Sequence, residues 1–144
     1  MSTTPDTHTS AAPAKRWSVQ VIAPASGPLQ VRRDGAPLDL NHIGPGQVTP
    51  VELLLVSIAT CFALSCHAAF GLRQQPISAF EVEVGGSKAP QLPSRLAEVR
   101  LKIRFAAELP TEEAQRIAVL AKQMCTVTNT LAVTPACALE VTVL

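Results

Sequence analysis

Four cysteines are the residues of this chain with the widest range of chemistry. They are Cys61, Cys66, Cys125 and Cys137. An ionised thiol is a nucleophile, an oxidisable group and a metal ligand, whereas a buried neutral thiol behaves as a small hydrophobe. The cysteines form no CxxC pair, so their spacing is not that of a zinc site. Each thiol is therefore either a packing residue or a redox group, and its position in the fold decides which.

Cys61 and Cys66 lie in a long apolar segment that begins with a strong helix signal. Thr49 is a suitable N-cap, Pro50 suits the first helical position, and Glu52 completes a capping box three residues after Thr49. The apolar pattern continues to Phe70, and Gly71 is a suitable C-terminal stop. This pattern predicts one long central helix, apolar on nearly all sides and buried in the protein.

Helix geometry separates the two cysteines. Five positions correspond to a rotation of about 140°, so Cys61 and Cys66 cannot form a disulfide within the helix. Ser57 and Ser65 lie four positions from Cys61 and share its side of the helix, where they could line one groove. Cys66 is predicted to be a core residue, and His67, which faces away, a helix-terminal or interface residue. From the residues alone, burial would raise the pKa of Cys61 and leave it inert, so a structural role stays open.

The same segment is long enough to cross a bilayer. It contains Ser57, Thr60, Ser65 and His67, and its ends carry neither an aromatic belt nor an asymmetry of basic residues. We therefore expect a buried helix of a protein that does not insert in a membrane.

Alternating apolar residues and turn signals predict the other elements. Trp17–Ala23, Leu29–Arg33 and Phe80–Val84 alternate as half-buried strands, and Asp34-Gly35 predicts a tight hairpin turn. An amphipathic helix is expected from Pro110 to about Cys125, with acidic residues in its first turn. Further strands are predicted at Pro37–Leu40, Val99–Phe105 and Leu139–Val143.

Composition limits the class of protein. The chain has 144 residues, 47% of them hydrophobic, and a net charge of +1 from 12 basic and 11 acidic residues. This near-neutral charge gives no basic surface for binding nucleic acid. A short chain with so high a hydrophobic fraction favours an oligomer. Residues 1–16 are predicted to be a disordered tail without a secretory signal, and residues 17–144 one domain. We expect a cytoplasmic protein with reduced thiols.

Two motifs together resemble the OsmC/Ohr family. GPGQVTPVELLLVSIATCFALSC contains Cys61, and CTVTNTL follows 64 residues later with Cys125. The Pro-Val-Glu-Leu-Leu-Leu form is similar to the general OsmC-like, YhfA-type branch rather than to Ohr proper. The resemblance implies an α+β fold, with antiparallel sheets packed on a long buried central helix, in an intertwined homodimer with two interfacial sites.

The resemblance also implies a reaction. The thiolate of Cys61 would attack an organic hydroperoxide and become a sulfenic acid, Cys125 would condense with it to a disulfide, and a dithiol reductant, lipoyl-type in Ohr enzymes, would restore both thiols. Neither a metal nor another cofactor is needed. Cys137 matches no cysteine of the family. At position 126 the chain has Thr where the family usually has Pro, which predicts a less rigid turn after Cys125.

The family's activating charges have no clear counterpart. The family pairs an Arg beside the first cysteine with a Glu at the position that Val51 occupies here. Glu52 is explained by capping, and Arg33 is the better candidate for the cation because it shares strand parity with inward-facing residues. The missing Glu favours an alternative: a non-enzymatic OsmC-like dimer that binds a small apolar ligand or acts as a thiol redox sensor.

Overall fold

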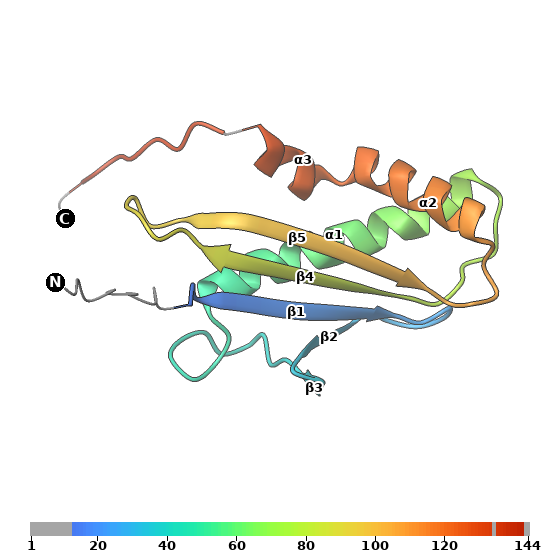
Figure 1. Cartoon of the computed structure of the whole chain (residues 1–144), viewed down its shortest axis with the longest axis horizontal. Coiled ribbons are helices and arrows are strands. Elements are labelled where there is room, and N and C mark those ends of the chain that lie inside the picture. Colours follow the sequence, from blue (N-terminus) through green and yellow to red (C-terminus); the bar gives the residue numbers. More distant parts are fainter. Residues whose placement is uncertain (1–12, 134, 143–144) are drawn as a thin grey trace, which may run out of the picture.

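One antiparallel sheet forms the frame of the molecule (Figure 1). The computed structural model describes residues 13–133 and 135–142. The strand order is β3-β2-β1-β4-β5, and every neighbouring pair is antiparallel. The strands are β1 (Arg16–Ala23), β2 (Gln30–Arg33), β3 (Ala36–Pro37), β4 (Phe80–Lys88) and β5 (Leu96–Phe105).

The β2–β3 hairpin turns as predicted but ends early. Asp34 and Gly35 both have positive φ, 51° and 78°, as a two-residue hairpin turn requires. The predicted return strand to Leu40 is wrong beyond Pro37. Asp39 accepts hydrogen bonds from the backbone and side chain of Asn41 at 2.9 and 3.0 Å, and this local turn ends the extended conformation.

The central helix α1 (Pro50–Leu72) begins at the predicted capping box. The Glu52 N–H donates to Thr49 Oγ1 at 3.2 Å, and the Thr49 N–H donates to Glu52 Oε2 at 2.7 Å. The predicted stop at Gly71 is wrong, because the helix continues to Leu72. Gln74 rather than Gly71 adopts positive φ, 53°, and Arg73 is the C-cap.

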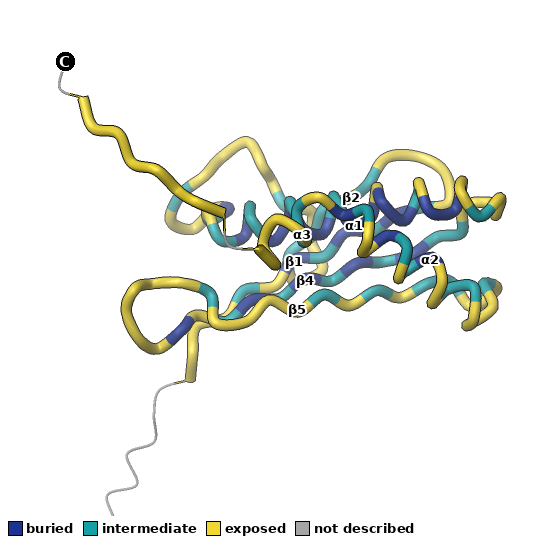
Figure 2. The backbone as a smooth tube through the Cα atoms, turned by 90° about the horizontal axis from the view of Figure 1, so that it is seen from above, coloured by how far each residue is buried: buried dark blue, intermediate teal, exposed yellow. Residues whose placement is uncertain are grey.

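The helix α1 covers one face of the sheet (Figures 1 and 2). Inward residues of β1 and β4 alternate with outward ones and pack against it, while the outer face carries ion pairs such as Arg104–Glu81 at 2.6 Å. The largest fully buried side chains are Phe62, Phe70, Leu55, Ile58, Ile117, Val19, Val21, Val48, Val82, Val84, Cys66 and Cys125. The predicted α+β fold with a buried central helix is confirmed.

Two further helices follow β5. The amphipathic helix α2 (Thr111–Met124) ends just before Cys125, as predicted, and Arg73 beyond α1 forms a bidentate ion pair with Glu113. The segment after Cys125 forms a short helix, α3 (Thr126–Ala132). Both helices pack beside α1 rather than on the outer face of the sheet (Figure 1).

Two predictions at the chain ends need correction. The final strand is wrong over residues 139–142, which are exposed and have no ladder partner; Val143 lies outside the described residues. Of the predicted tail, residues 1–12 also lie outside them, but Arg16 is already in β1. It pairs with Ser87, while the Lys15 carbonyl accepts a hydrogen bond from the Lys88 N–H at 2.9 Å.

The helix α1 is long and apolar enough to cross a membrane by length and composition. In the structure 56% of its most apolar window is buried against the sheet and α2, as expected of a core helix. The preference for a buried helix is thereby supported.

Candidate thiol site and its apolar cavity

Cys61 lies on the side of α1 that the sheet leaves open. Its side chain is half-buried and packs on the edge of the core. Leu64, three residues on, is 58% exposed, and Ala68 is exposed too. Because position 61 is about 140° around the helix from Cys66, the outer side of α1 presents Cys61 while the inner side buries Cys66.

The serines that share this region do not offer their protons to the Cys61 sulfur. The Ser57 hydroxyl donates to the Leu54 carbonyl at 2.7 Å, and the Ser65 hydroxyl donates to the Cys61 carbonyl at 2.8 Å. Ser65 is moreover buried. Both hydroxyls therefore donate to the backbone of α1, and stabilisation of a Cys61 thiolate requires another group.

Cys66 and Cys125 belong to the interior. Both are fully buried in one hydrophobic cluster with Phe62 and Ile117. Burial and the neighbouring Cys125 raise the pKa of Cys66 to about 12, so Cys66 stays protonated at neutral pH. The prediction that Cys66 is a core residue is confirmed.

Cys125 stands at the junction of α2 and α3. Its backbone is extended, with φ −75° and ψ 99°, and its carbonyl accepts hydrogen bonds from the Asn129 N–H at 3.1 Å and the Thr128 hydroxyl at 3.2 Å. Thr126, which occupies the position of the family's Pro, is the first residue of α3. These contacts fix the turn without proline. The pairing of Cys125 with Cys61 stays a prediction.

An ion pair joins β2 to the start of α1. Arg33 Nη1 lies 3.0 Å from both carboxylate oxygens of Glu52 and donates to the Gln47 carbonyl at 3.1 Å. Burial raises the pKa of Glu52, but hydrogen bonds from Thr49 and the Arg33 guanidinium outweigh it, and the pKa lies below its ordinary value of 4.5. The carboxylate is therefore ionised at neutral pH.

The sequence singles out both Arg33 and Glu52 but does not indicate that they form a pair. Arg33 does turn inward, as its strand parity predicted, yet its partner is a carboxylate and not a thiolate. Glu52 both caps α1 and binds Arg33, so helix capping alone does not explain the role of this glutamate. An inward arginine that needs a counter-charge was the signal that could have located the pair.

Within one chain, Glu52 and Cys61 are well separated. Nine helical residues correspond to about 13 Å along the axis. The Arg33–Glu52 pair and the Cys61 thiol are thus arranged along one helix, at two different levels. A cation for Cys61 would have to come from elsewhere.

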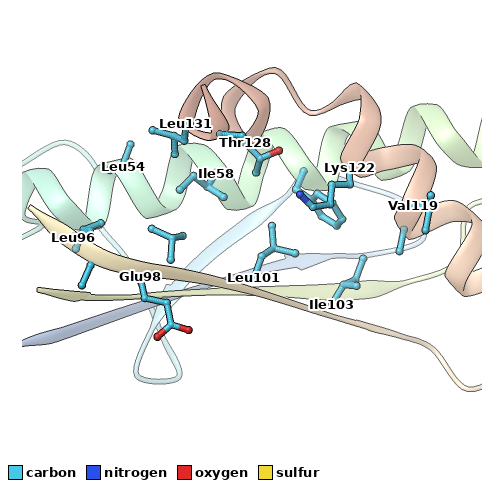
Figure 3. Close-up of a pocket in the computed structure, with 15 residues that line it drawn as sticks. Leu54, Ile58, Leu96, Glu98, Leu101, Ile103, Val119, Lys122, Thr128 and Leu131 are labelled. Atoms are coloured by element: carbon cyan, nitrogen blue, oxygen red, sulfur yellow. The ribbon is translucent and has the colours of Figure 1, made fainter. Parts of the chain in front are cut away.

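An apolar cavity of about 790 Å³ lies between α1, β5 and the two C-terminal helices. Figure 3 shows Leu54 and Ile58 of α1 facing Leu96, Leu101 and Ile103 of β5 across it. Ile58 is one helical turn from Cys61, and Thr128, which donates to the Cys125 carbonyl, belongs to the same lining. Glu98, Lys122, Val119 and Leu131 complete the labelled lining. No local sequence pattern indicates this cavity, because its walls come from four separate elements.

The described residues contain no group of three or more His, Cys, Asp or Glu side chains arranged to hold a metal ion. Cys137 is exposed, outside any helix or strand. All four cysteines are free thiols.

Comparison with known proteins gives a consistent result. The model of a family described as OsmC-like protein matches residues 43–140. An OsmC-like hydroperoxide resistance protein from Jannaschia sp. CCS1 superposes with a TM-score of 0.59 at 19% identity, over 89% of this chain and 94% of that one. A hypothetical protein from Aquifex aeolicus VF5 superposes with a TM-score of 0.57 at 17% identity, over 72% of this chain and 77% of that one. No curated protein matches significantly by sequence.

Proposed function

Because this chain belongs to the OsmC-like protein family, we propose that it is a cysteine-dependent peroxidase that reduces organic hydroperoxides. The name of the Jannaschia neighbour, a hydroperoxide resistance protein, supports this class of activity. The observation that carries the proposal is the position of Cys61, half-buried on α1 and one turn from the wall of a large apolar cavity. An apolar cavity beside a thiol suits an alkyl or aryl hydroperoxide better than hydrogen peroxide.

The proposed reaction has three balanced steps. The Cys61 thiolate attacks one oxygen of the peroxide, the O–O bond breaks, and the alkoxide leaves and takes up a proton as the alcohol. The resulting Cys61 sulfenic acid condenses with the Cys125 thiol, which forms the disulfide and releases water. A dithiol reductant then exchanges with this disulfide, returning both thiols and becoming oxidised itself.

The thiolate needs a cation, and we propose that a second copy of the chain supplies it. In an antiparallel pair of α1 helices that cross near Ser57, position 61 of one helix lies level with position 53 of the other. The Arg33–Glu52 pair of one copy would then stand beside Cys61 of the other, where the Arg33 guanidinium would stabilise the thiolate. Ser57 and Thr60 are small enough for close helix approach at such a crossing. The proposed assembly is therefore a homodimer with two sites.

A peroxide-consumption assay with dihydrolipoamide and tert-butyl hydroperoxide tests the proposal. Cys61→Ser should abolish consumption, and Cys125→Ser should stop turnover after one equivalent. Cys66→Ser and Cys137→Ser are matched controls that should keep turnover, because neither thiol has a part in the reaction. Full activity of Cys61→Ser would refute the proposal, and intact mass after one peroxide addition would identify the disulfide.

The cavity itself favours a second candidate, which is ligand binding without turnover. In that case the wild type would bind an apolar ligand but consume no peroxide, and Cys61→Ser would bind the ligand equally well.

A further inference from the structure

Three basic residues meet at the end of the sheet next to the start of α1. The Lys88 N–H donates to the Lys15 carbonyl at 2.9 Å, and the Ala89 N–H donates to the Arg95 carbonyl at 2.8 Å. These backbone bonds hold Lys15, Lys88 and Arg95 on three adjacent segments. Together with Trp17, Val51, Ser94 and Leu96 they line a cavity of about 230 Å³. We call Lys15, Lys88 and Arg95 the basic mouth.

No acidic residue is among the described residues that line the cavity at the basic mouth. None of the three cations of the basic mouth belongs to an ion pair within the described part of the chain, and Lys15 Nζ lies 5.1 Å over the Trp17 ring. Val51, in the first turn of α1, is an apolar part of the lining. A concave surface lined by one sign of charge concentrates counter-ions, so this cavity favours an anionic group.

The basic mouth lies next to the large apolar cavity. Leu96 lines both cavities. On α1, Val51 lines the small cavity, and Leu54, one turn further, lines the large one. Along β5 the apolar wall runs from Leu96 to Ile103, about 23 Å for an extended strand (Figure 3). A ligand that spans the two adjoining cavities over Leu96 would meet cations at one end and apolar side chains along its length, and we call this path the channel.

We infer that this channel binds a long-chain carboxylate, with the head group at Lys15, Lys88 and Arg95 and the tail between α1 and β5. A volume of about 790 Å³ is that of a site for one small ligand, so a single chain fits better than a two-tailed lipid. The inference shares the large apolar cavity with the peroxidase proposal but does not use its thiol chemistry. Peroxide consumption by Cys61→Ser and the carboxylate preference of the Lys88→Met, Arg95→Met variant therefore test the two proposals separately.

The single tryptophan of the chain, Trp17, lines the basic mouth and reports on it directly. Dodecanoate, titrated below its micelle concentration, should change Trp17 fluorescence saturably. Dodecanol, which has the same tail and no charge, should bind about tenfold more weakly, as expected for the loss of one charge-assisted hydrogen bond. Added salt should weaken dodecanoate binding and leave dodecanol unaffected.

Substitutions locate the head group. Lys88→Met with Arg95→Met should reduce dodecanoate affinity about tenfold and leave dodecanol binding unchanged. Lys102→Met is the matched control, because Lys102 alternates with Leu101 and Ile103 and points to the opposite face of the sheet. Far-ultraviolet circular dichroism confirms that each variant is folded, as expected for exposed side chains.

Three outcomes would overturn the inference. Equal affinity for dodecanoate and dodecanol would show that the basic mouth does not recognise a charge. A loss of carboxylate preference in Lys122→Met but not in the double variant would place the head group at the other end of the cavity. Dodecyl phosphate binding more than about tenfold more tightly than dodecanoate would assign the channel to a phosphate ester.

Discussion

The two sides of α1 place chemically identical thiols in opposite environments. On the inner side, Cys66 belongs with Phe62 and Phe70 to the hydrophobic core, fully buried and with a pKa raised to about 12. On the outer side, Cys61 is half-buried, and Leu64 nearby is 58% exposed. Five residues of helix thus separate a packing thiol from an accessible one.

This contrast shows what burial does to a cysteine. A thiolate buried in an apolar core loses its hydration without gaining a counter-charge, so the neutral form prevails. At the surface the cost of ionisation is lower, and a cation brought by another chain can stabilise the thiolate. The same helix can therefore carry a core residue, Cys66, and a reactive thiol, Cys61, provided that its outer side stays accessible to substrate.

The largest expected effect comes from exchanging the thiols one at a time. Cys61→Ser should lower peroxide consumption by more than about a hundredfold, because it removes the attacking nucleophile. Cys66→Ser should retain activity, provided that the protein remains folded. Initial rates with tert-butyl hydroperoxide and a dithiol measure the difference.

A chemical version of the same test needs no substitution. A thiol reagent such as DTNB at pH 8 should label Cys61 and Cys137 in the native protein, and Cys66 only after unfolding. Rapid labelling of Cys66 in the native state would contradict the difference between the two sides of α1.

The next effect concerns packing on the inner side. Leu55→Ala should lower the free energy of unfolding by about 2–5 kcal/mol, because Leu55 is fully buried and its removal leaves a cavity. The matched change on the outer side, Leu64→Ala, should cost less than about 1 kcal/mol in the monomer. Urea denaturation followed by Trp17 fluorescence compares them, and equal losses would mean that the outer side is packed as tightly as the inner.

Sequence reasoning predicted α1 well because its start is determined locally. The capping box of Thr49 and Glu52 and the apolar period need no tertiary information. The end of α1 was missed because Gly71 permits a stop without enforcing one, and contacts of Arg73 with Glu113 on a distant helix hold the last turn. The final strand failed for a related reason: alternation indicates a strand, but only a partner completes it.

The features of the candidate site also divide into those that local sequence predicts and those that depend on the fold. Cys61 and Cys125 were identified from motifs, and the inward direction of Arg33 from strand parity. The Arg33–Glu52 bond joins residues 19 apart, and the apolar cavity joins four elements, so neither follows from local pattern. Local sequence predicts residue types and directions; contacts between elements require the fold.

A third prediction concerns the ion pair at the start of α1. Glu52→Gln should lower the free energy of unfolding by about 1–3 kcal/mol at pH 7, because hydrogen bonds to a charged group are lost. The folded pKa of Glu52 is lowered below 4.5, so the advantage of the wild type is fully present above pH 4.5. As the pH falls through the lowered pKa, the unfolded state takes up the proton first and the advantage disappears.

Urea titrations of wild type and Glu52→Gln between pH 3 and pH 7 measure this convergence. Glu108→Gln, at an exposed position before α2, is a control that should follow the wild type. A stability difference between wild type and Glu52→Gln that stays constant over this range would show that the carboxylate is not held ionised by Thr49 and Arg33.

The smallest effect on the fold is expected on the outer side of α1, where it separates folding from assembly. Leu64→Glu should change the unfolding free energy of the monomer by less than about 0.5 kcal/mol, because the side chain is largely in solvent there. In the proposed homodimer the same side of α1 meets its copy, and two opposed carboxylates would repel each other in an apolar interface. Sedimentation should therefore show a monomer with nearly wild-type helix content, and peroxide consumption should fall because Cys61 loses the Arg33 of the other copy. A variant that stays dimeric and active would place the dimer contact elsewhere and leave the thiol without its proposed cation.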